Sequence, residues 1–187
     1  MAFTPVDRLV RVQALGVMLR EYEPGDAPDL VAAFLDKGIA CWNPGPSGPM
    51  APAEFMAGRN DWSETSHASW AVADATGRLV GSVSVHRIDP GQADAEIGYW
   101  VAPWARRQGH ATHAVVAASR FAFEQLTLHR LYLYHAVDNP GSCAVARAAG
   151  FAHEGTLRES FRYADGVYRD EHLHSLLAGD FNAAAMP

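Results

Sequence analysis

The sequence predicts one α/β domain built around a mixed sheet, and three observations support this. Stretches that alternate like strands are separated by stretches with helical spacing along most of the chain. One strand-like stretch, 95–101, runs through a turn containing Arg and Gly into a long helix pattern rich in small residues, 108–126. The 187 residues are 49% hydrophobic and 19% charged, which is typical of a globular domain with a substantial core.

The N-terminal half is expected to begin with a strand at 17–22, which ends at the sequence Glu-Pro-Gly-Asp. Asp26 suits the N-cap of a helix that extends to about residue 37. Residues 41–52 are dense in Pro and Gly, so we expect no regular element there. A short helix and three strands joined by turn signals then follow, at 53–60, 69–73, 79–87 and 93–101.

The C-terminal half continues with the helix at 108–126 and a strand at 130–137. The helix is expected to pack through five residues spaced for one face: Ala111, Val115, Ala118, Ala122 and Leu126. Asn139 and Pro140 open a further helix, and Gly150 ends it. Two last strands, 151–161 and 167–177, lie around the turn signal at 163–166.

Composition restricts the class of protein. No apolar stretch is long enough to span a membrane, and the N-terminus lacks the pattern of a secretory signal, so we expect a cytoplasmic protein. The net charge of −6 argues against nucleic acid as the main partner and is compatible with a cationic small substrate. Cys41 and Cys143 form no C-x-x-C pair, so we expect free thiols rather than a disulfide or a thiolate metal site.

The turn at 101–112 is the most informative stretch of the chain. At a helix N-terminus the first backbone N–H groups have no helical partner and the helix dipole is positive, which suits an anion. Gly109 permits close approach, Arg106 and Arg107 carry charge, and the Thr112 hydroxyl can add a hydrogen bond. Neither a P-loop nor a G-x-G-x-x-G fingerprint occurs. The alternative is an ordinary strand–turn–helix with solvated arginines.

The spacing Arg106-x-x-Gly109-x-Ala111 resembles the pyrophosphate-binding signature of the GNAT superfamily, which transfers acyl groups from acyl-coenzyme A. The element order, the strand 96–101, and Asn139-x-x-Ser142 followed by Gly150-Phe151 extend the resemblance over most of the chain. The segment 170–181 is similar to the branch of Rim-type ribosomal-protein N-terminal acetyltransferases. The resemblance implies a GNAT fold over 1–187, with a mostly antiparallel sheet splayed between strands 4 and 5 and helices on both faces.

The same resemblance implies that acetyl-CoA is the acyl donor. The strand before the turn would pair with the pantetheine arm, one of its N–H groups would polarise the thioester carbonyl, and the turn would hold the diphosphate. The implied cofactor-binding residues are Tyr99, Trp100, Val101, Arg106, Arg107, Gln108, Gly109, His110, Ala111, Thr112, Asn139 and Ser142. Gly98 suggests a bulge or a close approach in this strand, or else it makes room for a neighbouring side chain.

Three residues are candidate catalytic groups. Glu96 could accept the proton of the attacking ammonium directly or through water, or it could be a solvated strand residue. Asn139 could bind the pantetheine or the amine, and it is equally suited to cap its helix. Ser142 could protonate the leaving sulfur or satisfy local backbone. Cys143 has no base that the sequence locates, so direct attack in a ternary complex is favoured over an acyl-cysteine.

Nine histidines raise the possibility of a metal site. His172 and His174 share one strand face, and His129 and His135 flank another strand. No H-E-x-x-H occurs, and paired strand histidines are more often surface or cleft residues, so no metal is expected.

The acceptor is expected to be a small-molecule primary amine, bound near Trp42 and Trp62 and attracted by the carboxylates of Glu54, Asp61 and Glu64. The alternative is that Trp42 only anchors a long loop, and Trp70, which also lies near this segment, is expected in the core. A peptide N-terminus, as for ribosomal-protein acetyltransferases, stays open as the acceptor. A second alternative is that the protein binds CoA as a regulator and has no catalytic activity. The sequence also leaves open whether the protein is a homodimer.

Overall fold

The computed structural model describes residues 16–43 and 51–182. Its helices are α1 (Ala27–Phe34), α2 (Lys37–Trp42), α3 (Pro52–Asn60), α4 (His110–Glu124) and α5 (Pro140–Ala148), with short 3-10 turns at Pro24–Asp26 and Pro103–Ala105. Its strands are β1 (Met18–Arg20), β2 (His67–Ala73), β3 (Leu79–Asp89), β4 (Asp94–Val101), β5 (Arg130–Ala136), β6 (Ala152–Arg162) and β7 (Tyr168–Leu177).

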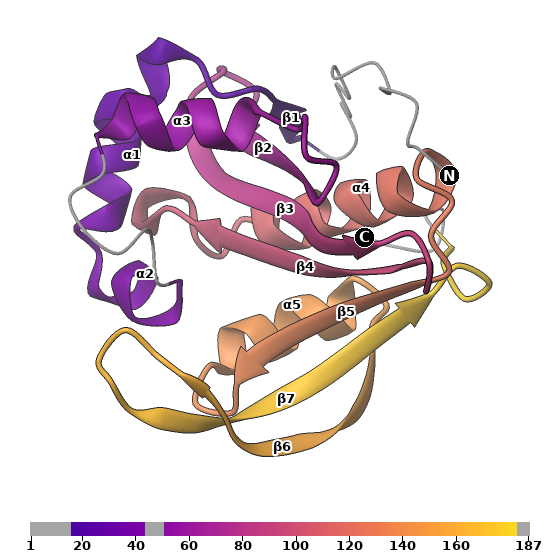
Figure 1. Cartoon of the computed structure of the whole chain (residues 1–187). Coiled ribbons are helices and arrows are strands. Elements are labelled where there is room, and N and C mark those ends of the chain that lie inside the picture. Colours follow the sequence, from indigo (N-terminus) through magenta and orange to yellow (C-terminus); the bar gives the residue numbers. More distant parts are fainter. Residues whose placement is uncertain (1–15, 44–50, 183–187) are drawn as a thin grey trace.

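The strands form one seven-stranded sheet in the order β1-β2-β3-β4-β5-β7-β6 (Figure 1). Neighbouring strands run antiparallel except β4 and β5, which are parallel and joined through α4. The expectation of a mixed, mostly antiparallel sheet with helices around it is therefore confirmed.

Two apolar cores lie on opposite faces of the sheet. Trp70 and Val72 of β2 pack with α4, whereas Ala71 between them packs with α1, α2 and α3, as the two-residue period of a strand requires. The α4 helix buries its small residues against β3 and β4, and α5 contacts β5 and β6. The sheet is thereby covered on both faces.

The two parallel strands separate along their length. β4 and β5 are paired only at Asp94–Arg130, Ala95–Leu131 and Glu96–Tyr132. Beyond Glu96, β4 continues to Val101 beside β3 alone, and Figure 1 shows β4 and β5 diverging toward α2. The edge of β4 that faces β5 is thus free of strand pairing over residues 97–101, and it borders an opening within the sheet.

The expected helix from Asp26 to about Lys37 is wrong, because the chain forms two helices there. α1 ends at Phe34, and the Asp36 side chain accepts a hydrogen bond from the Ile39 N–H at 2.9 Å, which starts α2 as a new helix. α2 includes Cys41 and Trp42, where no regular element was expected. The expectation for 44–50 lies outside the described residues.

The bounds of the other elements differ from the sequence prediction by no more than two residues. Within the described ranges, no helix combines the length and apolar character needed to cross a membrane.

Candidate active site

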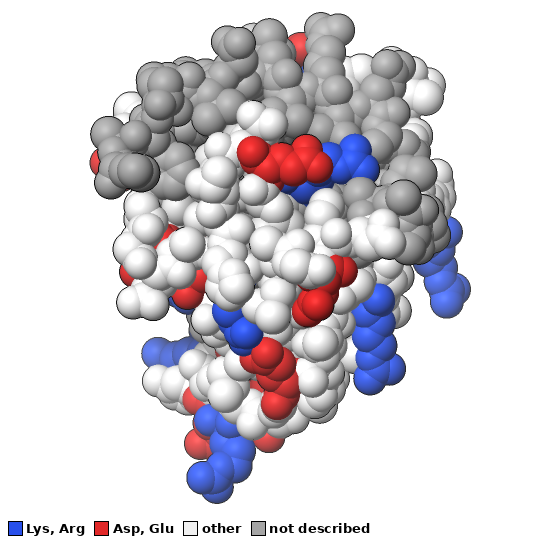
Figure 2. Space-filling model, turned by 90° about the vertical axis from the view of Figure 1, so that its right-hand side faces the viewer, with Lys and Arg blue, Asp and Glu red and all other residues white. Residues whose placement is uncertain are grey.

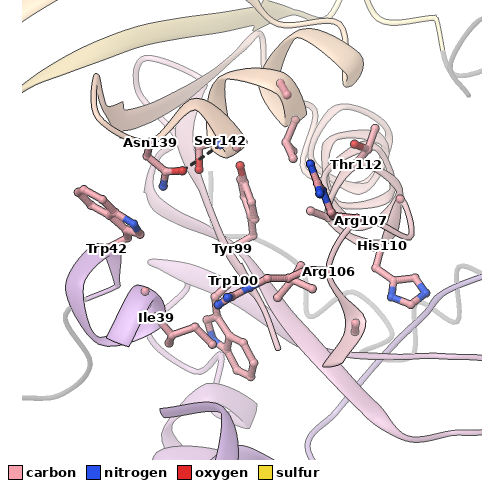
Figure 3. Close-up of a pocket in the computed structure, with 18 of the residues that line it drawn as sticks. Ile39, Trp42, Tyr99, Trp100, Arg106, Arg107, His110, Thr112, Asn139 and Ser142 are labelled. Atoms are coloured by element: carbon pink, nitrogen blue, oxygen red, sulfur yellow. Dashed lines mark hydrogen bonds between the residues drawn. The ribbon is translucent and has the colours of Figure 1, made fainter. Parts of the chain in front are cut away.

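A pocket of about 860 Å³ lies where β4 and β5 separate. Four parts of the structure contribute to it: α2, the end of β4, the turn leading into α4 with the start of that helix, and one side of α5 (Figure 3). The lining includes all of the residues that the sequence assigned to cofactor binding except Gln108. Gln108 lies on the same turn, and its side-chain amide donates to the Trp104 carbonyl at 3.3 Å.

The α4 end of the pocket has the backbone conformation of an anion site. Gly109 is the N-cap of α4 with φ at +82°, and no side chain caps the helix. The N–H groups of His110, Ala111 and Thr112 therefore lack both a helical and a side-chain partner, and all three residues line the pocket.

A side chain at position 109 would disturb this turn in two ways. A positive φ is costly for any residue with a Cβ. In addition, a Cβ built on Gly109 would lie 3.1 Å from Cε1 of His113, one turn further along α4. Glycine at this position is thus required by the turn itself.

The two arginines of the turn have different surroundings. Arg106 forms an ion pair with Asp36, with Nη2 and Oδ1 2.6 Å apart, and this hydrogen bond lowers the Asp36 pKa. Because Asp36 also caps α2, the pair fixes α2 against the α4 turn and sets one wall of the pocket. Arg107 is exposed and has no hydrogen bond or ion pair among the described residues, so its guanidinium is available to a ligand.

The α5 end of the pocket supplies polar groups. The Asn139 side chain accepts a hydrogen bond from the Ser142 N–H at 3.2 Å. Asn139 thus caps α5, which is one of the two roles expected for it. Figure 3 shows Tyr99 extending from β4 toward Ser142. Burial raises the Tyr99 pKa to about 12, with the neighbouring Ser142 hydroxyl opposing part of that effect. Tyr99 thus stays protonated at neutral pH and, together with Ser142, can donate a proton inside the pocket.

Glu96 lies at the last β4–β5 pair and is not among the pocket-lining residues. Its two oxygens contact His86 Nε2 at 3.3 Å and Arg87 Nη1 at 2.9 Å. Burial alone would raise the Glu96 pKa, but His86 and Arg87 together hold it below its ordinary value. Glu96 is therefore ionised at neutral pH and can accept a proton only weakly by itself.

His86 was not singled out from the sequence. Its Nδ1 lies 3.2 Å from the Ser84 hydroxyl, and its Nε2 faces Glu96, so the ring is held between the two. The alternation of β3 places Ser84 and His86 on one face, and the register sets His86 opposite Glu96. This pairing needs the strand register, which the sequence does not give.

Gly98 is not at a bulge. Its pairing with Ser84 is part of a continuous β3–β4 register, and the irregularity in this pair of strands lies between His86 and Asp89. A Cβ at Gly98 would lie 2.9 Å from His86 Cε1. Gly98 therefore makes room for a neighbouring side chain, the His86 ring, which is the second of the two explanations that the sequence left open.

The structure separates the two tryptophans expected at the acceptor site. Trp42 of α2 lines the pocket, contacts the Tyr163 ring edge-on at 5.4 Å, and has the Arg169 guanidinium 5.5 Å from its ring centroid. Trp62 instead packs edge-on against Trp70 and Phe121 at 5.1 and 6.2 Å. Trp62 thus packs against the core beside Trp70, which is buried as expected, and the placement of Trp62 in this cleft is wrong.

Comparison with known proteins agrees with this geometry. Residues 17–152 match the family model described as an acetyltransferase (GNAT) domain. The chain therefore belongs to the GNAT acetyltransferase family. The expected class and fold are confirmed, including the relationship to ribosomal-protein acetyltransferases.

Among its relatives, the chain is 34% identical over 101 residues to the spermidine N(1)-acetyltransferase of Vibrio cholerae, covering 54% of this chain and 58% of that protein. It is 34% identical over 97 residues to the ribosomal-protein-serine acetyltransferase of Escherichia coli, covering 52% and 54%. These matches span little more than half the length of each relative. The crystal structure of spermidine N-acetyltransferase from Vibrio cholerae with CoA and spermine superposes with a TM-score of 0.76 at 26% identity, covering 89% of this chain and 98% of that one.

Proposed function

We propose that the protein transfers the acetyl group of acetyl-CoA to the primary amine of a small molecule. The observation that carries the proposal is the pocket at the β4–β5 separation, which joins an uncapped helix N-terminus to the free edge of β4. A diphosphate fits the α4 turn, and an extended pantetheine arm fits the unpaired β4 edge. A relative that binds CoA in its crystal structure supports the same assignment.

The residues present suit the three demands of the reaction. The free edge of β4 over 97–101 offers backbone N–H groups to the thioester carbonyl oxygen as negative charge develops there. The neutral amine attacks the carbonyl carbon, the carbon–sulfur bond breaks, and the thiolate takes a proton from Ser142 or Tyr99 at the α5 end of the pocket. The amine's own proton would reach Glu96 through water, because neither Glu96 nor His86, which contacts it at 3.3 Å, lines the pocket.

The preference for a small amine rests on the α2 side of the pocket. Trp42 stands there with a guanidinium on its ring, an arrangement that a second cation such as a polyamine could extend or replace. The net charge of −6 and the relative named for spermidine point the same way. On the face shown in Figure 2, acidic and basic side chains are interspersed rather than gathered by sign, which does not favour a nucleic acid. We further place the protein in the cytoplasm, where acetyl-CoA and such amines occur together.

The test is release of the CoA thiol from acetyl-CoA with matched acceptors. The panel holds spermidine, an amino sugar, a primary alkylamine, and two short peptides, one acidic and one basic, each with a free and a blocked N-terminus. Rapid release with the small amines and slow release with the peptides supports the proposal. Release only with free peptide N-termini shows that a protein N-terminus is the acceptor, as the relative named for ribosomal-protein serine would suggest. CoA binding without release by any acceptor would favour a regulator.

A further inference from the structure

A cluster of histidines and one cysteine lies outside the pocket, between α5 and the sheet. His135 of β5, Cys143 of α5, and His172 and His174 of β7 each offer one nitrogen or sulfur atom, and these four atoms lie within 4.8 Å of one another. The register explains the grouping, because His135 stands opposite His172 and Leu133 stands opposite His174. All three rings therefore share the sheet face that α5 covers.

The donor nitrogens are buried and poorly satisfied. His135 and His174 are 5% and 0% exposed. Nδ1 of His172 and Nδ1 of His174 are buried without a hydrogen-bond partner among the described residues. The neighbouring carboxylate does not serve them, because Glu171 accepts hydrogen bonds from Ser160 and Tyr163 at 2.8 and 2.9 Å. Buried polar atoms normally have partners, so the unpartnered Nδ1 of His172 indicates a ligand that no protein atom provides, whereas His174 would bind through Nε2, which faces Nε2 of His135.

The tautomer of His135 suits a metal. Nδ1 of His135 lies 2.8 Å from the Ala136 carbonyl oxygen and must donate to it, so the lone pair is on Nε2. That nitrogen lies 3.2 Å from Nε2 of His174, within hydrogen-bond distance when no ion lies between the rings. A neutral imidazole with a free lone pair is the form that binds a metal.

The spacing of one pair of nitrogens and the chemistry of the donor set fit zinc, and the other donor atoms would have to close in around the ion. A tetrahedral site with Zn–N bonds of 2.0–2.1 Å places two ligand nitrogens about 3.3 Å apart. The observed separation between His135 and His174 is 3.2 Å. Thiolates and imidazoles are the ligands that zinc takes, and four of them fill its tetrahedral coordination, whereas magnesium and calcium require oxygen ligands.

We propose that His135, Cys143, His172 and His174 bind one Zn²⁺ ion that fastens α5 to β5 and β7. The sequence predicted neither this metal nor a thiolate site at Cys143, because the four residues meet only through the β5–β7 register and the docking of α5. Cys143 directly follows Ser142, so the ion would hold the helix whose first turn forms one end of the pocket. Thiolate ligation also makes Cys143 a structural residue rather than a nucleophile.

The test begins with untagged full-length protein purified in the presence of zinc and analysed by mass spectrometry for bound metals. The zinc is then removed with a chelator, and Co²⁺ is titrated back to report tetrahedral geometry through its visible bands and thiolate ligation through its charge-transfer band. One equivalent of metal per chain with both spectral signatures supports the proposal. Folded protein that retains no zinc and gives no Co²⁺ bands overturns it.

Variants identify the ligands. Cys143→Ser should abolish the charge-transfer band, and His172→Ala should weaken Co²⁺ binding at least tenfold. Cys41→Ser, the other cysteine of the chain, and His153→Ala, whose ring packs against His172 at 4.7 Å, are matched controls that should bind as the wild type does. Loss of metal in either control, or an unchanged charge-transfer band in Cys143→Ser, contradicts the ligand set.

Substituting a proposed zinc ligand could unfold the protein, so a further measurement uses a variant that keeps all four ligands. In Cys41→Ser the only thiol is Cys143. Added Zn²⁺ should slow its alkylation at least tenfold and raise the midpoint of thermal unfolding, because a ligand that binds the native state stabilises it. An alkylation rate that zinc does not change contradicts thiolate ligation. Neither readout uses acetyl transfer, so this result is separate from the proposed function.

Discussion

Replacing Gly109 by valine should weaken CoA binding roughly 10- to 100-fold while the fold persists. The left-handed φ of +82° costs a residue with a Cβ about 1–2 kcal/mol, and a β-branched residue at the upper end of that range. The new Cβ also meets the His113 ring at 3.1 Å. The turn can relieve both only by rotating, and this displaces the N–H groups of His110, Ala111 and Thr112 from the pocket.

The loss of affinity follows from the hydrogen bonds that are displaced. A hydrogen bond to a charged group contributes about 1.5–3 kcal/mol, so losing one at the diphosphate weakens CoA binding roughly 10- to 100-fold. Isothermal titration calorimetry with CoA measures the effect. Gly77→Val is the matched control, because Gly77 has the same left-handed conformation at φ +88° but no atom within 4 Å of its Cβ position. It should lose stability and bind CoA normally. A folded Gly109→Val protein with wild-type CoA affinity would refute the assignment of the α4 turn.

Three further changes test the other ends of the site. Glu96→Gln should lower kcat at least tenfold with little effect on CoA affinity. Because the folded state lowers the pKa of Glu96, the stabilisation from its ion pairs is complete above the ordinary pKa and is lost as the pH falls through the folded-state pKa. The free energies of unfolding of wild type and variant should therefore converge only in acid, and convergence at neutral pH would argue against the ion pairs. Ser142→Ala should slow turnover several-fold in steady-state kinetics, more so when combined with Tyr99→Phe, whereas wild-type rates in the double variant would mean that water protonates the thiolate. Trp42→Ala should raise the KM for the amine about tenfold, as loss of a cation–π contact of about 1–2 kcal/mol implies. Trp62→Ala, at a partly buried residue, should lower stability by about 1–3 kcal/mol without a specific effect on that KM, and the reverse pattern would reassign the acceptor side.

Local sequence predicted the parts of the site that local geometry builds. The turn before α4 is specified by neighbouring residues, since Gly109 takes the left-handed conformation and the helix begins directly after it. The same holds for α5, where Asn139 and Pro140 start the helix and Gly150, at φ +83°, ends it. The strands were recognisable because each buries apolar residues at alternate positions along its length.

The parts that strand register and helix docking build were not predictable. The contact of His86 with Glu96 depends on which residues of β3 and β4 pair. The grouping of Cys143 with three histidines requires β7 to insert between β5 and β6 and α5 to cover that face. Trp62 and Trp42 flank the same Pro-rich stretch, yet one packs against Trp70 and the other lines the pocket, because tertiary packing rather than sequence distance separates them.

The most direct measurement of the central claim is a single reaction followed in two ways: release of the CoA thiol from acetyl-CoA, and the mass of the amine acceptor. The account predicts that thiol release depends on the amine and that the amine gains one acetyl group per thiol released. At limiting acetyl-CoA, Gly109→Val should lower both signals roughly 10- to 100-fold while Gly77→Val keeps them. Amine-independent thiol release, or transfer that survives intact in Gly109→Val, would contradict it.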